Sequence, residues 1–147
     1  MFLERLFFEF IFICSLMFLV LFYLRLFMDV VKLRRANKIS LGHGKNSKLE
    51  RAVRAHANFI EYVPLSIMLS LVLYFHNLLF FSCLSILLLI FGRVCHKKGI
   101  TNYKEKNENF KFRRLGMRLT IYSFYSSIIG LILYLGQTLY FFIKNHL

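Results

Sequence analysis

Three long apolar blocks constrain this chain more than any other feature of its sequence. The first runs from Leu6 to Leu24 and the second from Ala57 to Ile90, each with a single formal charge, and the third, Leu119 to Ile143, has none. A helix that crosses a bilayer needs about 20 largely apolar residues. The first and third blocks therefore each predict one membrane helix. The second is long enough for two helices that turn at His76-Asn77.

These blocks predict an all-α integral membrane protein, a bundle of four transmembrane helices in a single domain over residues 1–147. The composition agrees, since 58% of the residues are hydrophobic and soluble domains have about 45–50%. The first block lacks a small-residue cleavage site before the basic segment, so we interpret it as a retained helix and not a signal peptide. We expect helices over about residues 3–31, 48–75, 78–96 and 112–143.

The net charge of +13 is concentrated in two segments, residues 32–54 and 93–118, which hold 17 of the 20 Lys and Arg residues. In a four-helix protein, these two segments connect helices on the same side of the membrane. The positive-inside rule places them in the cytoplasm and both termini outside. The basic residues therefore indicate a multi-pass topology, and we expect no nucleic-acid partner.

Local signals predict how the helices begin and end. The loop over residues 40–46 carries two glycines, which favour turns. Ser47 is the expected cap of the second helix, because Glu50 follows three residues later. Pro64 is expected to bend that helix. The polar segment Lys97 to Lys111 is expected to form an exposed loop.

The cysteines and histidines give no sign of a metal site. None of the three cysteines belongs to a CxxC pair, and none of the five histidines shows an HxxxH or HExxH spacing. The cysteines lie in or at the ends of apolar helices, so we expect them to be small buried hydrophobes. These cysteines are Cys14, Cys83 and Cys95.

The second helix carries a directed polar stripe. At about 100° per residue, Arg51, Arg54, Asn58, Glu61 and Tyr62 occupy roughly a quarter of its circumference, over about three turns. An ionised Glu at membrane depth costs about 2.5 kcal/mol or more. Hydrogen bonds between membrane helices contribute only about 0.6–2 kcal/mol each. A binding role is therefore favoured over helix adhesion, although adhesion stays open from this feature alone.

One further residue in the same stretch lies outside the stripe. His56 points to nearly the opposite side of the second helix. We therefore exclude His56 from the predicted site.

Other polar residues are expected at the same level of the bundle. Arg114, Arg118 and Tyr122 follow at spacing four on the last helix, and Arg93 and His96 close the third. Several cations thus meet a single acid, which favours a small ligand with several carboxylates and one ammonium group.

The sequence resembles a known family at these residues. The segment LERAVRAHANFIEYVP, residues 49–64, is similar to the second-helix signature ER..RAH.N..E..P of the MAPEG superfamily, the membrane-associated proteins in eicosanoid and glutathione metabolism. FGRVCH at residues 91–96 and RRLGM at residues 113–117 resemble its third-helix and fourth-helix motifs. The likeness is greatest to the small bacterial branch, which implies a bacterial inner membrane.

The resemblance implies a homotrimer that binds glutathione as a cosubstrate in clefts between adjacent subunits. Arg118 would activate the thiol, and Tyr122 would assist as a hydrogen-bond donor. We include Arg51 and Arg114 in the predicted binding set because they belong to the polar stripes of the second and fourth helices. The complete set of binding residues expected is Lys32, Arg51, Arg54, Asn58, Glu61, Arg93, His96 and Arg114.

We therefore expect a glutathione transferase or peroxidase that acts on hydrophobic electrophiles or lipid hydroperoxides from the bilayer. The chain departs from the prostaglandin synthase of the family at Ala57, Ile100 and Leu119. One alternative is a non-catalytic membrane protein of the same fold that binds a lipid or a protein partner. A small multidrug transporter is a third alternative, disfavoured because the acid at membrane depth, Glu61, lies in the second helix beside arginines.

Overall fold

The computed structural model describes residues 2–101 and 110–146 of the chain. They form four α-helices and no strand in this described part. All four are long and apolar enough to cross a membrane, as predicted. The helices are α1 (Phe2–Asn37), α2 (Ser47–Phe75), α3 (Leu79–Thr101) and α4 (Lys111–His146).

Three helices extend beyond their predicted ends, α4 by only three residues, to His146. The first continues through Lys32 and the basic residues to Asn37, and the third continues past His96 to Thr101. The prediction of an exposed loop from Lys97 was therefore wrong for residues 97–101, and the remainder of that loop up to residue 109 lies outside the described residues. Straight-chain basic residues have good helix propensity and tolerate a helical conformation where the chain leaves the membrane.

The structure corrects one predicted helix cap. Asn46, and not Ser47, caps α2, because its side-chain oxygen accepts hydrogen bonds from the backbone N–H groups of Lys48 and Leu49. The predicted turns are confirmed. Gly42 and Gly44 adopt positive φ angles of 67° and 54° in the first loop.

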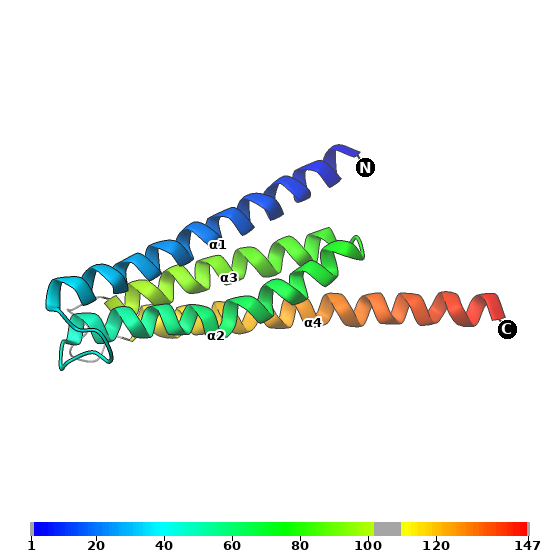
Figure 1. The fold of residues 1–147 in the computed structure, drawn as a ribbon. Coiled ribbons are helices and arrows are strands. Elements are labelled where there is room, and N and C mark those ends of the chain that lie inside the picture. The colour runs from blue at the N-terminus through cyan, green and yellow to red at the C-terminus, as the bar shows by residue number, and fades with distance from the viewer. Residues whose placement is uncertain (1, 102–109, 147) are drawn as a thin grey trace.

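The helices run side by side, and the α1–α2 loop, the end of α3 and the start of α4 lie at one end (Figure 1). The short α2–α3 turn and both termini lie toward the other end, as the topology argument predicted. α2 continues through Pro64 without interruption, and its axis changes direction near the middle of its length (Figure 1). α4 extends well past the α2–α3 turn. A Cβ atom on Gly136 of α4 would meet no atom of another part of the described chain within 4 Å.

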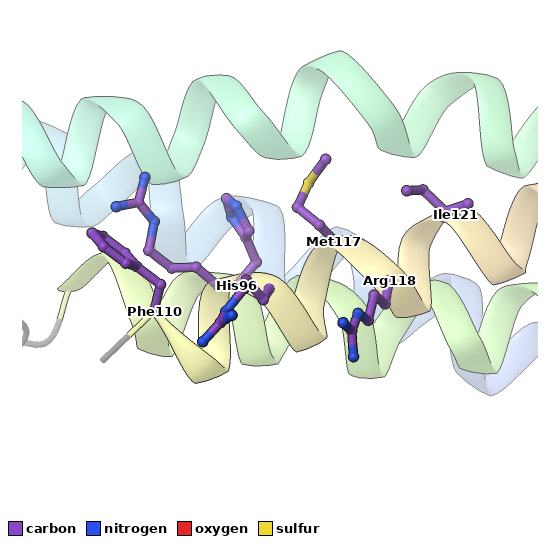
Figure 2. Close-up of a pocket in the computed structure, with 7 residues that line it drawn as sticks. His96, Phe110, Met117, Arg118 and Ile121 are labelled. Carbon is purple, nitrogen blue, oxygen red and sulfur yellow. The ribbon is translucent and has the colours of Figure 1, made fainter. Parts of the chain in front are cut away.

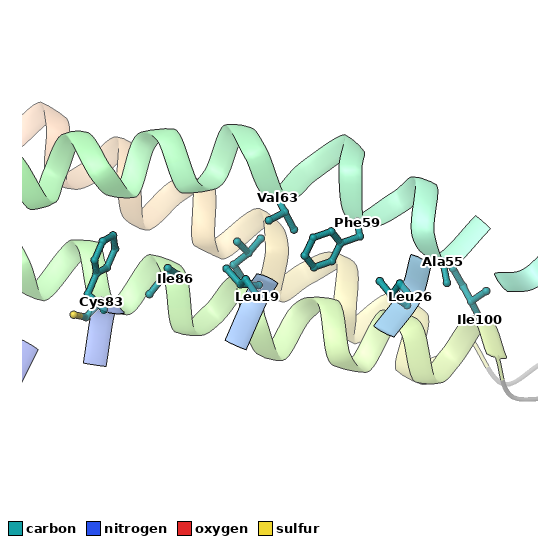
Figure 3. Packing of buried hydrophobic residues seen from close by; sticks show 10 residues of the cluster. Leu19, Leu26, Ala55, Phe59, Val63, Cys83, Ile86 and Ile100 are labelled. Carbon is teal, nitrogen blue, oxygen red and sulfur yellow. The ribbon is translucent and has the colours of Figure 1, made fainter. Parts of the chain in front are cut away.

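An apolar cluster joins α1, α2 and α3 (Figure 3). The cluster includes Leu19 and Leu26 of α1, Phe59 and Val63 of α2 and Ile86 of α3. In lipid such contacts stabilise a bundle by close packing and not by removal of water, because the lipid tails are equally apolar. The ring of His56 lies against that of Tyr23 of α1, tilted by 31° and at 5.3 Å between ring centroids. This confirms that it lies away from the polar stripe.

A network of serine hydroxyls holds α2, α3 and α4 together on the other side of the bundle. Ser85 of α3 lies at its centre and contacts the hydroxyl oxygens of Ser127 at 2.7 Å and Ser123 at 3.1 Å, both on α4. Ser70 of α2 donates to Ser85 at 3.1 Å, and Ser66 of α2 lies 2.9 Å from Ser123. All five are fully buried. Serine hydroxyls allow close helix approach and also supply interhelical hydrogen bonds.

One glycine on each helix, Gly92 and Gly116, allows α3 and α4 to approach closely near the basic end. A Cβ atom on Gly92 would lie 2.7 Å from Thr120 Oγ1, and one on Gly116 would lie 2.6 Å from the backbone nitrogen of His96. Both distances are too short for a real side chain. The pair therefore fixes the separation and register of the two helices.

The cysteines only partly follow their prediction. Cys83 is buried, and its thiol donates to the carbonyl of Phe8 at 3.2 Å. Cys95 is half-buried, but Cys14 is exposed, so the prediction of a buried Cys14 was wrong. Cys14 lies on the outer face of α1, which also exposes Phe10 and Met17. A thiol there can face lipid, because it is small and weakly polar.

Candidate anion-binding site

Arg93 organises the polar groups near the basic end of the bundle. It follows Gly92 on α3, so the close approach of α3 and α4 places its guanidinium between three helices. Only 3% of the residue is exposed. A buried charge of this kind requires several hydrogen-bond partners.

Those partners come from α2 and α4. One Arg93 nitrogen donates to the side-chain oxygen of Asn58 at 2.7 Å and to its backbone carbonyl at 3.2 Å. The other terminal nitrogen, Nη2, donates to the hydroxyl of Thr120 on α4. That hydroxyl in turn donates to the carbonyl of Gly116 at 2.8 Å. The guanidinium carbon also lies 5.1 Å from the centroid of the Tyr62 ring, a cation–π distance.

This arrangement orients the Asn58 amide. Because Arg93 occupies the oxygen, the Asn58 NH₂ group is left as the donor of that side chain, and it makes no hydrogen bond to any described residue. Asn58 is half-buried at the edge of α2. Its amide is therefore available to a ligand that carries an acceptor such as a carboxylate.

The predicted stripe of α2 divides into two edges. Arg51, Asn58 and Tyr62 face inward, and Arg51 donates to the carbonyl of Ile100 on α3 at 2.9 Å. Arg54 and Glu61 are exposed on the outer edge. Neither has a hydrogen bond or ion pair within the described part of the chain. The outer edge is therefore the part of the stripe that is open to a ligand.

A small polar pocket of about 240 Å³ adjoins this outer edge at the basic end. Arg51 and Arg54 of α2 and Arg113 of α4 line it together with Glu50 and Ile100. Three guanidinium groups beside one carboxylate favour an anion, because Arg binds carboxylate and phosphate groups through paired hydrogen bonds.

His96 is buried where α3 meets α4, with 7% of the residue exposed. It contributes to a second, open pocket of about 480 Å³ along α4 (Figure 2). Arg113, Arg114 and Arg118 line the same pocket with apolar residues that include Met117. An apolar floor bordered by arginines suits an amphipathic ligand.

Arg118 and Tyr122 lie on the outward face of α4. Arg118 points away from the side that carries Met117 and Ile121, which faces α2 (Figure 2). Helical geometry agrees, since Arg118 lies about 140° around the helix from Arg113. Tyr122 is 54% exposed. Within this chain, therefore, the predicted catalytic pair does not meet the outer edge of α2.

Lys32 shares a pocket with Arg51 but with no other predicted site residue. It is exposed near the end of α1 and lines a third pocket with Lys48 and Arg51. Within this chain, the structure thus brings together Arg54, Asn58, Glu61 and Arg93 along the polar stripe of α2. It does not bring Lys32, Arg118 or Tyr122 to them.

Two contributors were not anticipated from the sequence. Thr120 holds Arg93, and Arg113 points into the pocket that contains Arg54. The spacing of Thr120 four residues after Gly116 is the signal that could have identified it. This spacing places both residues on the face of α4 that contacts α3. The predicted binding set contains its neighbour Arg114 in place of Arg113, but Arg114 is exposed.

Four apolar helices with arginine-lined pockets at one end define a polytopic helical membrane protein that is suited to binding small anions near the membrane surface. More specifically, the chain belongs to the MAPEG family, whose model matches residues 10–134. The family resemblance read from the sequence is thereby confirmed.

Curated relatives are bacterial. The chain is 32% identical over 93 residues to Inner membrane protein YecN of Escherichia coli strain K12. The aligned residues cover 63% of this chain and 67% of YecN. The protein of the same name from Escherichia coli O6:H1 strain CFT073 gives the same identity and coverage. Both names state a membrane location and no activity.

Proposed function

We propose that this protein is a membrane-embedded glutathione transferase or peroxidase that acts on hydrophobic electrophiles or lipid hydroperoxides dissolved in the bilayer. The observation that carries the proposal is the open outer edge of α2, where Arg54 and Glu61 present a cation and a carboxylate, with the amide donor of the half-buried Asn58 beside them. Its polarity and length match glutathione.

The length can be worked out from helix geometry. Arg54 and Glu61 are seven residues apart, which corresponds to about 10.5 Å along the axis at about 1.5 Å per residue. A tripeptide spans about 10 Å when extended. Glu61 would bind the ammonium group at one end of glutathione, and Arg54 would bind the carboxylate at the other. The Asn58 amide lies between them and would donate to an acceptor in the middle.

The chemistry requires a cation near the sulfur. Glutathione reacts as its thiolate, which a guanidinium stabilises in a low-dielectric cleft. Arg118 is the proposed activating residue, with Tyr122 as a donor to the sulfur. For an aryl halide, the thiolate forms the new C–S bond, the halide leaves with the bonding electron pair, and the thiol proton passes to water.

The proposed assembly is a homotrimer in a bacterial inner membrane, with the basic end in the cytoplasm. The outward direction of Arg118 and Tyr122 supports a site that a second copy completes, because one subunit does not bring them to α2. The charge distribution supports the orientation. The name of the E. coli relative supports the choice of membrane.

The test measures glutathione binding and turnover separately. We expect the purified protein to bind glutathione by calorimetry and to conjugate it to 1-chloro-2,4-dinitrobenzene. Arg54→Gln should weaken binding by about 10-fold to 150-fold, since a hydrogen bond to a charged group contributes about 1.5–3 kcal/mol. The matched control is Arg25→Gln, which removes an exposed arginine of α1 outside every proposed site.

Arg118→Gln separates catalysis from binding. It should abolish most turnover while glutathione binding is largely retained and the oligomer stays intact. Binding without any turnover in the wild-type protein would support the non-catalytic alternative. A protein that shows neither binding nor turnover would contradict the proposed function altogether.

A further inference from the structure

We infer that the groove between α1 and α2 binds a lipid chain that carries a hydroxyl group, and that Tyr23 and the carbonyl of Ile60 bind this hydroxyl. The groove has a volume of about 410 Å³, which lies within the range of small-molecule sites, about 300–1,000 Å³. It is separate from the proposed glutathione site, because Val63 in its wall lies about 160° around α2 from Glu61. The inference does not depend on the proposed function.

The wall of the groove is apolar apart from one phenol. Leu19, Val20 and Tyr23 of α1 line it together with Phe59, Val63, Pro64 and Ile67 of α2. Leu19, Phe59 and Val63 belong to the apolar cluster of Figure 3. Val20 is 59% exposed, so the groove opens toward the surrounding lipid. A hydrocarbon chain can therefore enter it sideways from the bilayer.

Tyr23 lies deeper than the charged end of the bundle. Asp29, six residues later in α1, pairs with Lys97 of α3 at 3.4 Å, and six residues correspond to about 9 Å along the helix axis. The Tyr23 ring contacts the rings of His56 and Phe59, at 5.3 Å and 6.0 Å between centroids. These contacts hold the phenol in place beside the groove at the depth of the lipid chains.

Polar groups beside the groove lack hydrogen bonds that a ligand can supply. The Tyr23 hydroxyl makes no hydrogen bond to any described residue, and Nε2 of His56 is buried without a partner among them. Pro64 has no N–H, so it cannot donate to the carbonyl of Ile60 four residues earlier. That carbonyl points along α2 toward Pro64, which lines the groove. Unpaired polar groups are costly at this depth, because no water replaces the missing partner.

A hydroxyl group complements these polar groups. It can accept a hydrogen bond from the phenol of Tyr23 and donate one to the carbonyl of Ile60 at the same time. A ketone could only accept from Tyr23. An unmodified acyl chain would fill the groove but leave both groups unpaired. The chemistry of the groove therefore favours a hydroxylated chain over these two alternatives.

The experiment compares two neutral lipids as ligands of the full-length protein in a nonionic detergent. Methyl 10-hydroxystearate carries the hydroxyl and methyl stearate lacks it, and neither ester has a charge that the basic pockets would attract. Each ester competes with the fluorescent methyl ester of cis-parinaric acid, whose loss of emission gives the apparent affinity. Partition into detergent micelles is the same for every variant, so the differences between variants report on the groove.

Tyr23→Phe removes the hydroxyl and keeps the ring. It should weaken binding of the hydroxylated ester by about 3-fold to 30-fold, the range for a hydrogen bond between neutral groups within a membrane. Its affinity for methyl stearate should stay the same. The matched control is Tyr125→Phe, because Tyr125 is exposed on α4 and lies outside the groove. This control should change the affinity for neither ester.

Val20→Phe tests the groove itself. The larger side chain should occupy the open side of the groove and abolish the binding of both esters. Val72→Phe is the matched control, since Val72 is an exposed residue of α2 outside the groove. It should bind both esters as the wild-type protein does. Size-exclusion chromatography and circular dichroism establish that each variant is folded before its affinity is measured.

Three results would overturn the inference. Unchanged affinity of Tyr23→Phe for the hydroxylated ester would mean that the phenol does not bind the hydroxyl. Equal weakening by Tyr23→Phe and Tyr125→Phe would mean that the hydroxyl is not recognised in this groove. Binding that survives Val20→Phe, or no binding of either ester to the wild-type protein, would mean that the groove is not a lipid site; a second copy of the chain would then be the occupant to test.

Discussion

Replacement of Thr120 by Val tests whether Arg93 holds the bundle together at the basic end. Valine has nearly the shape of threonine, so no cavity forms, but the acceptor for one Arg93 nitrogen disappears. The Nε atom of Arg93 is already buried without a partner among the described residues. The variant would therefore leave a second donor of a buried charge unsatisfied, and only Asn58 would still accept hydrogen bonds from it.

The magnitude follows from the charge on the donor. A hydrogen bond to a charged group contributes about 1.5–3 kcal/mol, whereas neutral side-chain hydrogen bonds in a membrane protein average about 0.6 kcal/mol. We expect Thr120→Val to lower the free energy of unfolding by about 1.5–3 kcal/mol. The assay is reversible unfolding in dodecyl maltoside by added sodium dodecyl sulfate, followed by circular dichroism.

Thr138 provides a matched control on the same helix. Its hydroxyl donates to the carbonyl four residues earlier at 2.9 Å, as that of Thr120 does at 2.8 Å, but Thr138 is exposed and contacts no arginine. Thr138→Val should therefore change stability by less than about 0.5 kcal/mol. If the two variants were equally stable, the reasoning about Arg93 would be refuted.

The same variant links stability to the proposed function. Arg93 leaves the Asn58 NH₂ group as the available donor, so loss of Thr120 should loosen that amide and weaken glutathione binding. Thr120→Ser, which keeps the hydroxyl, should restore the affinity even though it lacks the methyl group. A purely structural role of Thr120 would not give this rescue.

The remaining predictions concern helix packing and capping, each measured by the same unfolding assay. Gly116→Ala should destabilise by about 1–3 kcal/mol, because its new Cβ would overlap the α3 backbone; Gly136→Ala, with open space around it, should be neutral or slightly stabilising. Ser85→Ala should cost about 1–2 kcal/mol through the buried serine network, whereas the exposed Ser40→Ala should cost almost nothing. Asn46→Ala should cost about 1 kcal/mol through loss of the α2 cap. Comparable stability of each variant and its control would contradict the stated contact.

The serine network shows where sequence-based reasoning stopped. Serines in an apolar helix are common, and their spacing does not reveal which helices they join. Ser85 contacts residues 15 to 42 positions away in the chain, so its role exists only once three helices are packed. The cap of α2 illustrates a smaller limit, since Asn46 and Ser47 are both good capping residues and the backbone conformation decides between them.

The sequence by itself determined the four membrane helices, the placement of both basic connections at one end and the family. These features depend on the length of apolar blocks, on the chain order of the charges and on a local motif, all of which are properties of neighbouring residues. Only the tertiary structure showed that Arg93 binds Asn58 and Thr120, that the stripe of α2 divides into an inner and an outer edge, and that Arg118 points away from α2. The physical reason is that side-chain partners depend on the rotation and separation of packed helices. The contacts of Gly92 and Gly116 set these for α3 and α4.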